Sequence, residues 1–343
     1  MGDLTVKRRL SFAVAACVFA FCFLCGCKTY ERTEFFALDT FITLTVEKTG
    51  GDVLKKAENL VKGYEDKFSV TKETSEIYRL NAEKSLTVFE DTADLIKNAL
   101  ALCEQTGGAL DITVYPLVKA WGFTTGENKV PSSEELSAVL PLVNYRNVAV
   151  NGNTVTLNSG MLMDLGAVAK GFITDKLIDL LKENGIESGT VSLGGNVYAL
   201  GKNDGKDFSI GIVSPFGDGT FCGIRVSDKA VITSGQYQRF FEKDGKTYGH
   251  IIDPLTGTPV ENEFASVTVI GDNGLLCDAL STALFVMGKD KATEFYRERA
   301  DFGFIFILKD GSVTISEDIA DCFSLADGHK DGKVTVIYKD DKN

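Results

Sequence analysis

Histidine and proline are scarce in this chain of 343 residues, and basic residues are fewer than acidic ones. The only two histidines are His250 and His329, which excludes a histidine-rich metal site. The six prolines leave little scope for rigid linkers between domains. Acidic residues outnumber basic ones by 48 to 36, so the net charge is −12. A chain with this charge gains little binding energy from the phosphate backbone of a nucleic acid. We therefore expect no nucleic-acid partner.

The composition is otherwise that of a folded protein, with 44% hydrophobic and 24% charged residues. This balance excludes disordered and collagen-like classes. The 34 glycines indicate many tight turns. Helical patterns and antiparallel-looking hairpins are mixed without βαβ regularity and without an internal repeat. We predict one large α+β domain over residues 35–343, with mainly antiparallel sheets and packed helices.

The N-terminal segment has the pattern of a secretory signal. A basic stretch at residues 7–9 precedes an uncharged apolar run at residues 10–24. That run is shorter than the about 20 residues that a membrane-spanning helix needs, and its length is typical of a signal peptide.

The run ends in Leu24-Cys25-Gly26-Cys27, which resembles a bacterial lipobox whose last cysteine carries lipid. We predict a lipoprotein signal peptide over 1–26, lipidation of Cys27 and a short tether over 27–34. The alternatives are an ordinary cleavage site or an uncleaved signal anchor. The prediction makes the protein a bacterial membrane lipoprotein, held at the cytoplasmic membrane and facing the periplasm or the cell exterior.

Four cysteines remain beyond the signal, at positions 103, 222, 277 and 322. Their wide spacing does not indicate a disulfide framework, and we expect buried free thiols.

Hydrophobic periodicity and turn residues predict the main elements. We expect helices at 52–68 with Asp52 as N-cap, 91–106, a short one after the capping box Ser132–Glu135, 169–183, 275–287 and 289–299. Strands are expected at 35–46, in short pieces through 189–270, and at 302–308, 312–315 and 333–338. Hairpin turns are expected at Asn151-Gly152, Asp244-Gly245 and Asp310-Gly311.

Three segments contain candidate functional residues. Asp164 enters a glycine-rich turn that opens a helix containing Lys170, an arrangement suited to an anion. The alternative is a plain loop with a surface lysine, because the pattern matches neither a Walker A loop nor a Rossmann fingerprint. His250 precedes a dense polar turn, and a lone histidine is more often structural than catalytic.

The third segment places Asp278 and Thr282 four residues apart, on one face of a helix. Carboxylate and hydroxyl oxygens suit a hard cation such as Mg²⁺. The alternative is a capping Asp and a buried Thr bonded to its own turn, and these residues alone favour that alternative.

Taken together and in order, the segments resemble the ApbE-type FAD:protein FMN transferase family, also called thiamine-biosynthesis lipoproteins. The resemblance runs from about Phe35 to Ile307 through eight segments: LDTFITLTV, FSVTKETSEIYRLN, GGALDITVYPLVKAWGF, MDLGAVAKGF, VSLGGNVYALG, AVITSGQYQRFF, YGHIIDPLTGTPV and CDALSTALFVMG. A lipobox is also common in the family.

The resemblance implies that the chain takes FAD as substrate with Mg²⁺ on its pyrophosphate. It implies metal ligands at the Ala167 carbonyl, Asp278 and Thr282, with Ser281 adjacent. It places further residues around the flavin nucleotide: Leu38, Ala109, Leu110, Asp111, Asp164, Lys170 and Ile251. Two positions depart from the family pattern. Leu38-Asp39 stands where many members have Met-Gly or Met-Asp, and Thr71 stands where some have an aromatic residue.

The implied reaction moves FMN from FAD onto a Thr or Ser hydroxyl of an exported or membrane protein and releases AMP. The family's acceptors are subunits of sodium- or ion-translocating NADH or ferredoxin redox complexes. The hydroxyl needs a base, and His250 is the only histidine in a matching motif, so His250 and Asp278 are the predicted catalytic residues. We expect the rate to rise with pH through a pKa near that of imidazole. Two alternatives stay open: a Mg²⁺-dependent FAD pyrophosphatase and a non-catalytic flavin-binding lipoprotein.

Overall fold

The computed structural model describes residues 29–48, 50–299 and 301–340. The predicted signal peptide and Cys27 lie outside the described residues. No helix in the described part of the chain is long and apolar enough to cross a membrane. Residues 30–34, which we assigned to a tether, instead form part of strand β1 (Tyr30–Ala37), because each of them pairs with a residue of strand β2 (Thr40–Glu47).

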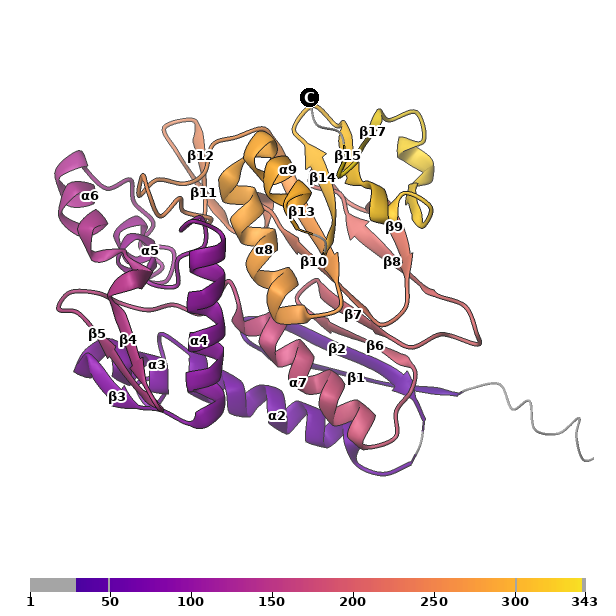
Figure 1. The fold of residues 1–343 in the computed structure, drawn as a ribbon, viewed down its shortest axis with the longest axis horizontal. Helices are drawn as coiled ribbons and strands as arrows, with labels where there is room; N and C mark the ends of the chain where they lie inside the picture. Colours follow the sequence, from indigo (N-terminus) through magenta and orange to yellow (C-terminus); the bar gives the residue numbers. More distant parts are fainter. Residues whose placement is uncertain (1–28, 49, 300, 341–343) are drawn as a thin grey trace, which may run out of the picture.

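A nine-stranded sheet occupies the centre of the molecule (Figure 1). Its order is β1-β2-β6-β7-β10-β13-β14-β15-β17, and only the β15–β17 pair is parallel. The remaining bounds are β6 (Gly189–Leu193), β7 (Asn196–Leu200), β10 (Lys229–Ser234), β13 (Phe264–Gly271), β14 (Gly303–Leu308), β15 (Val313–Ser316) and β17 (Val334–Ile337). The predicted α+β class with mainly antiparallel sheets is confirmed.

The strand predicted over 35–46 is wrong, because the chain folds back at Leu38-Asp39 to form the β1–β2 hairpin. Both turn residues have positive φ, 55° and 56°. This is an uncommon conformation for a leucine, and no glycine or asparagine marks the turn. The flanking aromatic and β-branched residues therefore look like one uninterrupted strand.

The predicted helices are present as α2 (Val53–Phe68), α4 (Glu90–Gln105), α6 (Ser133–Val139), α7 (Ala169–Glu183), α8 (Gly274–Met287) and α9 (Lys289–Arg297). The capping box at Ser132 and Glu135 is complete. Asp52 precedes α2, but its side chain makes no cap hydrogen bond and instead pairs with Lys56 at 3.1 Å. Two helices that we did not predict are α3 (Glu76–Glu83) and α5 (Tyr115–Trp121).

Apolar side chains on the two faces of the sheet belong to separate cores. Strand β14 shows the division: Phe304 and Phe306 join the core under helices α7 and α8, and Ile305 and Ile307 join the core on the other face. That second core is closed by a small sheet of β8 (Phe208–Val213), β9 (Thr220–Val226) and β16 (Phe323–Leu325). Burial on both faces explains why β14 is a continuous apolar run.

Several other elements form a lobe beside the helices. They include a sheet of β3 (Ser85–Thr87), β4 (Val148–Asn151) and β5 (Thr154–Leu157), and the hairpin of β11 (Phe240–Lys243) and β12 (Lys246–Gly249). Trp121 of α5 donates from Nε1 to the Gly257 carbonyl at 2.8 Å. This bond ties the segment that follows His250 to the lobe.

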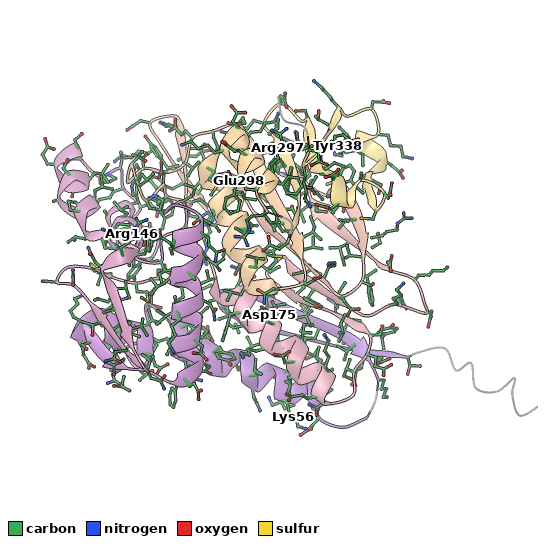
Figure 2. All side chains as sticks on the ribbon, in the orientation of Figure 1. Lys56, Arg146, Asp175, Arg297, Glu298 and Tyr338 are labelled. Carbon is green, nitrogen blue, oxygen red and sulfur yellow. The ribbon has the colours of Figure 1, made fainter. Side chains whose placement is uncertain are left out.

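The described cysteines are free, as expected. Cys103, Cys222 and Cys277 are buried free thiols, and Cys322 is free and partly buried. Polar groups are also bonded across elements; Asp175, for example, lies where α7 meets the start of α8 (Figure 2).

Candidate active site

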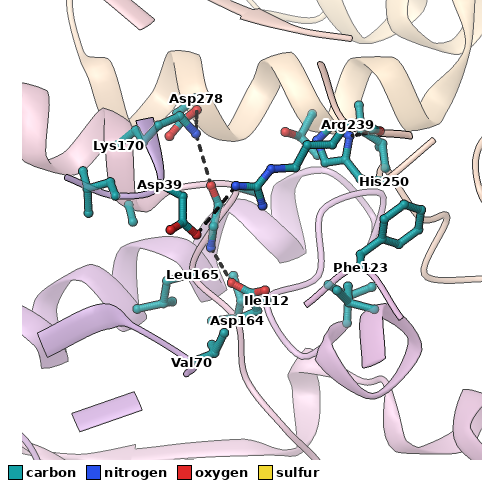
Figure 3. Close-up of a pocket in the computed structure, with 18 of the residues that line it drawn as sticks. Asp39, Val70, Ile112, Phe123, Asp164, Leu165, Lys170, Arg239, His250 and Asp278 are labelled. Carbon is teal, nitrogen blue, oxygen red and sulfur yellow. Dashed lines mark hydrogen bonds and ion pairs between the residues drawn. The ribbon is translucent and has the colours of Figure 1, made fainter. Parts of the chain in front are cut away.

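A cavity of about 870 Å³ opens where the β1–β2 turn, the loop after α4, the N-terminus of α7, helix α8 and the segment after β12 converge (Figure 3). It brings together all the residues predicted for the site except Ser281. Those that line it are Leu38, Ala109, Leu110, Asp111, Asp164, Ala167, Lys170, His250, Ile251, Asp278 and Thr282. Residues from five distant parts of the sequence therefore share one cavity.

Asp278 is held at the base of the cavity by bonds from two other elements. Its Oδ2 accepts from the Gly171 amide of α7 at 2.8 Å, and its Oδ1 accepts from Nδ2 of Asn196 at 2.8 Å. The Lys170 ammonium lies 3.9 Å from Oδ1. Burial raises the pKa of Asp278, and the Lys170 charge acts in the opposite direction. The result is a fixed, buried carboxylate beside a cation.

Thr282 lies one turn further along α8. Its Oγ1 is 3.3 Å from Oγ of Ser234, and that hydroxyl is 2.7 Å from Oγ of Ser281. Ser281 is fully buried and also bonds to the Asp278 carbonyl, so it lies behind the cavity wall rather than on it. Ser234 lines the cavity in its place.

The donors at this end of the cavity fit Mg²⁺. They are oxygen atoms of three kinds, a carboxylate (Asp278), a hydroxyl (Thr282) and a backbone carbonyl (Ala167), and all three residues line the same space. Hard divalent cations prefer such ligands. No group of three or more His, Cys, Asp or Glu side chains that could hold a metal ion occurs in the described residues, so Asp278 is the one charged donor of this set.

The Asp164–Lys170 segment forms the turn that we predicted before α7. Asp164 is fixed by backbone bonds: its amide donates to the Ile112 carbonyl at 2.8 Å, and its Oδ1 accepts from the Gly166 amide at 2.7 Å. Burial raises its pKa. Lys170 is part of the first turn of α7, where its charge adds to the positive end of the helix dipole. This corner of the cavity suits an anionic group.

Asp111 lines the cavity, but its carboxylate already accepts bonds from Thr113 of its own loop and from Tyr145 of a distant segment. Oδ1 accepts from the amide and hydroxyl of Thr113 at 2.7 and 2.6 Å, and Oδ2 accepts from the Tyr145 amide at 3.0 Å. These bonds hold the Ala109–Asp111 segment in place. Leu38 is held similarly, because its amide donates to Oε1 of Glu65 at 3.2 Å. Both residues shape the cavity through their backbone.

His250 lies on the opposite wall, and its ring is oriented by a backbone carbonyl. Nδ1 is 3.0 Å from the Arg239 carbonyl, which can only accept, so Nδ1 carries the proton and Nε2 has the free lone pair of the neutral ring. Burial is the main cause that lowers the pKa of His250, to about 4, and the charges of Arg239 and Lys170 act in the same direction. This pKa is lower than the ordinary imidazole value on which the expected pH dependence of the rate was based, and that dependence stays a prediction.

Sequence reasoning missed several residues of the cavity. Arg239 points into it opposite Lys170 and lies 3.6 Å from the exposed Asp39 carboxylate (Figure 3). Phe123 places an aromatic ring in the cavity lining, and Thr71, which also lines the cavity, has no ring. Asn196 bonds to Asp278. Arg239 and Asn196 fall inside segments that carried the resemblance, but neither spacing nor residue type distinguishes them from ordinary turn residues.

Comparison with known proteins identifies the family of the chain. Residues 38–306 match the model of the ApbE family. The chain is 34% identical to the FAD:protein FMN transferase of Klebsiella pneumoniae over 75% of this chain and 82% of that protein. It is 33% identical to the FAD:protein FMN transferase of Treponema pallidum over 88% of this chain and 92% of that protein.

Among solved structures, the ApbE protein of Thermotoga maritima superposes with a TM-score of 0.79 and 35% identity, covering 84% of this chain and 98% of that one. The family match spans most of the chain, and its limits enclose every residue that lines the cavity. This chain is a member of the ApbE family.

Proposed function

We propose that this protein is a Mg²⁺-dependent FAD:protein FMN transferase, which joins FMN to a Thr or Ser hydroxyl of another protein and releases AMP. The observation that carries the proposal is the convergence of Asp278, Lys170, Arg239 and His250 on one cavity. Its volume of about 870 Å³ lies near the upper end of the range of about 300–1,000 Å³ for ligand sites, as a dinucleotide requires.

The chain supplies the charge that a pyrophosphate needs. Lys170 and Arg239 approach the cavity from two sides and neutralise phosphate oxygens, Arg239 through its planar fork and Lys170 as a point charge. Asp278, Thr282 and the Ala167 carbonyl would hold Mg²⁺. The bound ion would stabilise the negative charge that develops on the phosphates.

The transfer step breaks the phosphoanhydride bond of FAD and forms a phosphoester bond to the acceptor. The acceptor hydroxyl oxygen bonds to the FMN phosphorus, the bond from that phosphorus to the bridging oxygen breaks, and AMP leaves with the bridging oxygen. Nε2 of His250 takes the hydroxyl proton. The negative charge of bound FAD beside Arg239 and Lys170 raises the pKa of His250 from about 4, which makes the ring a stronger base in the complex.

The proposal is tested by incubating the mature protein with FAD, Mg²⁺ and the extramembrane domain of a redox-complex subunit from the same genome. Mass spectrometry of the acceptor should show an FMN adduct that depends on Mg²⁺, and AMP should appear with it. Release of free FMN and AMP without an adduct would favour the FAD pyrophosphatase. FAD that binds but stays intact would favour the non-catalytic flavin-binding protein.

We further propose that the protein acts as a lipoprotein at the outer face of the cytoplasmic membrane, on subunits of ion-translocating NADH or ferredoxin redox complexes. The support is the apolar run at 10–24 followed by Leu24-Cys25-Gly26-Cys27. Cys27→Ser should leave the protein without lipid and recoverable without detergent, as measured by phase partitioning. A substituted protein that still partitions with the membrane would contradict the lipid anchor.

A further inference from the structure

Two carboxylates join helices α7 and α8 in a reciprocal way. Asp278 of α8 accepts from the Gly171 amide in the first turn of α7, at 2.8 Å. Asp175 of α7 accepts from the first two amides of α8, with Oδ1 on Gly274 at 2.6 Å and Oδ2 on Leu275 at 2.9 Å. Each helix therefore supplies a carboxylate that satisfies otherwise unpaired amides at the start of the other.

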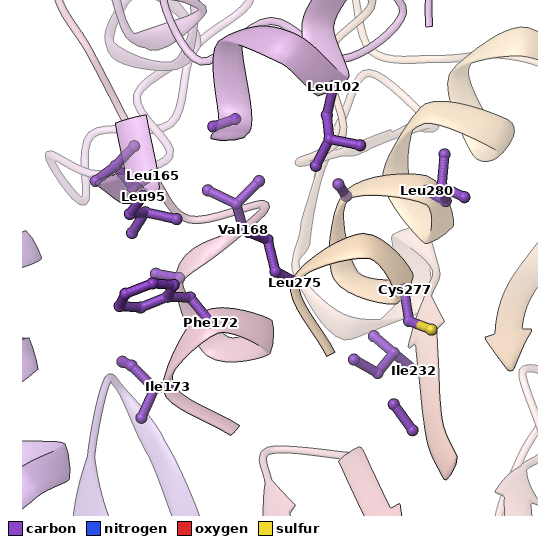
Figure 4. Packing of buried hydrophobic residues seen from close by; sticks show 14 of the residues in the cluster. Leu95, Leu102, Leu165, Val168, Phe172, Ile173, Ile232, Leu275, Cys277 and Leu280 are labelled. Carbon is purple, nitrogen blue, oxygen red and sulfur yellow. The ribbon is translucent and has the colours of Figure 1, made fainter. Parts of the chain in front are cut away.

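The two helices touch backbone to backbone at this crossing. A Cβ added to Gly171 would lie 2.2 Å from the Gly274 carbonyl oxygen and 2.6 Å from Cβ of Asp278. A Cβ added to Gly274 would lie 2.7 Å from the Gly171 carbonyl oxygen and 2.8 Å from Oδ1 of Asp175. Figure 4 shows Val168 and Leu275 packed between the same two helices. The crossing therefore leaves no room for one helix to shift while the other stays.

Asp175 is not needed merely to cap α8. The helix has its own N-cap, since Oδ1 of Asn273 accepts from the Leu276 amide at 2.7 Å. Asp175 adds bonds that reach across to α7, and burial raises its pKa to about 6, so its charge is kept at some cost. A carboxylate that only capped the start of α8 would not need to be buried between the two helices.

We propose that Asp175 is a positioning residue for the metal-binding end of the cavity: by clamping the start of α8 onto α7, it fixes the Asp278 carboxylate beside Lys170. The inference rests on the proposed function, because it assigns Asp278 to Mg²⁺. Residues that orient metal ligands typically affect metal affinity by about 10–100-fold. The clamp acts through backbone position, so it affects Asp278 and Lys170 together.

The test compares Asp175→Asn with Asn273→Ala. Both remove bonds at the start of α8, but only the first removes bonds to α7. Asp175→Asn should raise the Mg²⁺ concentration for half-maximal FAD cleavage about tenfold or more, with a smaller change in FAD affinity measured by flavin fluorescence without metal. Asn273→Ala should lower the melting temperature but leave the Mg²⁺ requirement within about twofold.

Hydrogen exchange of the protein without FAD or metal gives a readout independent of turnover. Asp175→Asn should increase exchange in peptides from both helix starts, near Gly171 and near Gly274, whereas Asn273→Ala should increase it only in α8. If Asp175→Asn does not fold, Gly274→Ala takes its place, because its added Cβ presses on Asp175 and on the Gly171 carbonyl without removing a partner.

The positioning role is overturned if Asp175→Asn and Asn273→Ala shift the Mg²⁺ requirement equally, or if neither shifts it while the wild-type protein cleaves FAD. Unchanged exchange near Gly171 in Asp175→Asn would also overturn it. A wild-type protein without Mg²⁺-dependent FAD cleavage would show instead that the proposed function is wrong, and the role of Asp175 at a metal site would fall with it.

Discussion

The two walls of the cavity are built differently. The helix wall, formed by α7 and α8, carries Asp278 with 3% of its surface exposed and with bonds from Gly171 and Asn196. The loop wall carries Arg239 and Asp39, whose side chains are 55% and 81% exposed and which meet only at 3.6 Å. The helix wall is therefore preformed, whereas the loop wall has one largely exposed cation, Arg239, that can engage a ligand.

The ionisable groups of the two walls also differ: burial raises the pKa of the carboxyl groups on one wall and lowers the pKa of the histidine on the other. On the helix side burial raises the pKa of Asp278 and of Asp164, which lies in the turn before α7. On the loop side it lowers the pKa of His250 to about 4. Both shifts follow from the cost of burying charge. The helix side thus holds acids that a cation would stabilise, and the loop side holds a neutral base.

The largest expected effect comes from removing the charged ligand of the helix wall. Asp278→Asn should lower the rate of FAD cleavage by about 10³-fold, equivalent to ~4 kcal/mol, for transfer and hydrolysis alike. Thr282→Val is the matched control one turn away and should cost about tenfold or less, because water can replace a neutral hydroxyl. Normal turnover by Asp278→Asn at limiting Mg²⁺ would contradict the metal assignment.

On the loop wall, His250→Gln should lower the transfer rate by about 10²-fold while FAD affinity stays within a few-fold. The reason is that, in the proposed reaction, His250 takes a proton while Lys170 and Arg239 contact the phosphates. The wild-type rate should rise with pH through the pKa of His250 in the FAD complex, and the variant should lose that rise. Loss of FAD affinity and melting temperature together, with the pH profile kept, would instead give His250 a structural role.

A smaller effect is expected from Arg239→Ala, which should raise the KM for FAD about tenfold and change kcat less, because an exposed cation contributes to binding more than to chemistry. Steady-state kinetics of AMP release would measure both constants. Arg239→Lys should recover only part of the loss, since Lys cannot make a bidentate contact. An unchanged KM would show that the loop wall does not bind phosphate.

The smallest effect concerns stability against pH. The folded pKa of Asp175, about 6, lies above its unfolded value of ~3.9, so its contribution is present at low pH and is lost as pH rises through about 6. The folded pKa of His250, about 4, lies below its unfolded value of ~6.5, so stability is lost as pH falls from 6.5 toward 4. The contributions of Asp175 and His250 to the pH dependence of the free energy of unfolding therefore have opposite signs in the wild-type protein.

Single substitutions should therefore separate the two contributions. Between pH 7 and pH 5, His250→Gln should gain stability relative to wild type and Asp175→Asn should lose it, each on the order of 1–2 kcal/mol. Chemical denaturation of both variants at the two pH values measures the difference, in which the other titrating groups cancel. If the stability relative to wild type changes in the same direction in both variants between pH 7 and pH 5, the assigned pKa shifts are contradicted.

The sequence predicted the helix wall better than the loop wall. Periodicity placed α7 and α8, so Lys170 could be assigned to the start of a helix, and Asp278 and Thr282 to one helix face, before their surroundings were known. The β1–β2 turn was missed because Leu38 and Asp39 adopt positive φ without a glycine. Arg239 and Asn196 were missed because their roles depend on partners far away in sequence, Asp39 and Asp278. Local pattern carries no information about such contacts.

The proposed reaction is tested most directly by the ratio of FMN–protein adduct to AMP formed by the wild-type protein with FAD, Mg²⁺ and an acceptor domain. In the proposed reaction, residues of the helix wall bind the pyrophosphate of FAD, and His250 on the loop wall takes the proton of the acceptor hydroxyl. Adduct and AMP should then form in equal amounts throughout the reaction. FAD cleavage that yields AMP at the same rate with and without the acceptor, and with no adduct, would contradict this account.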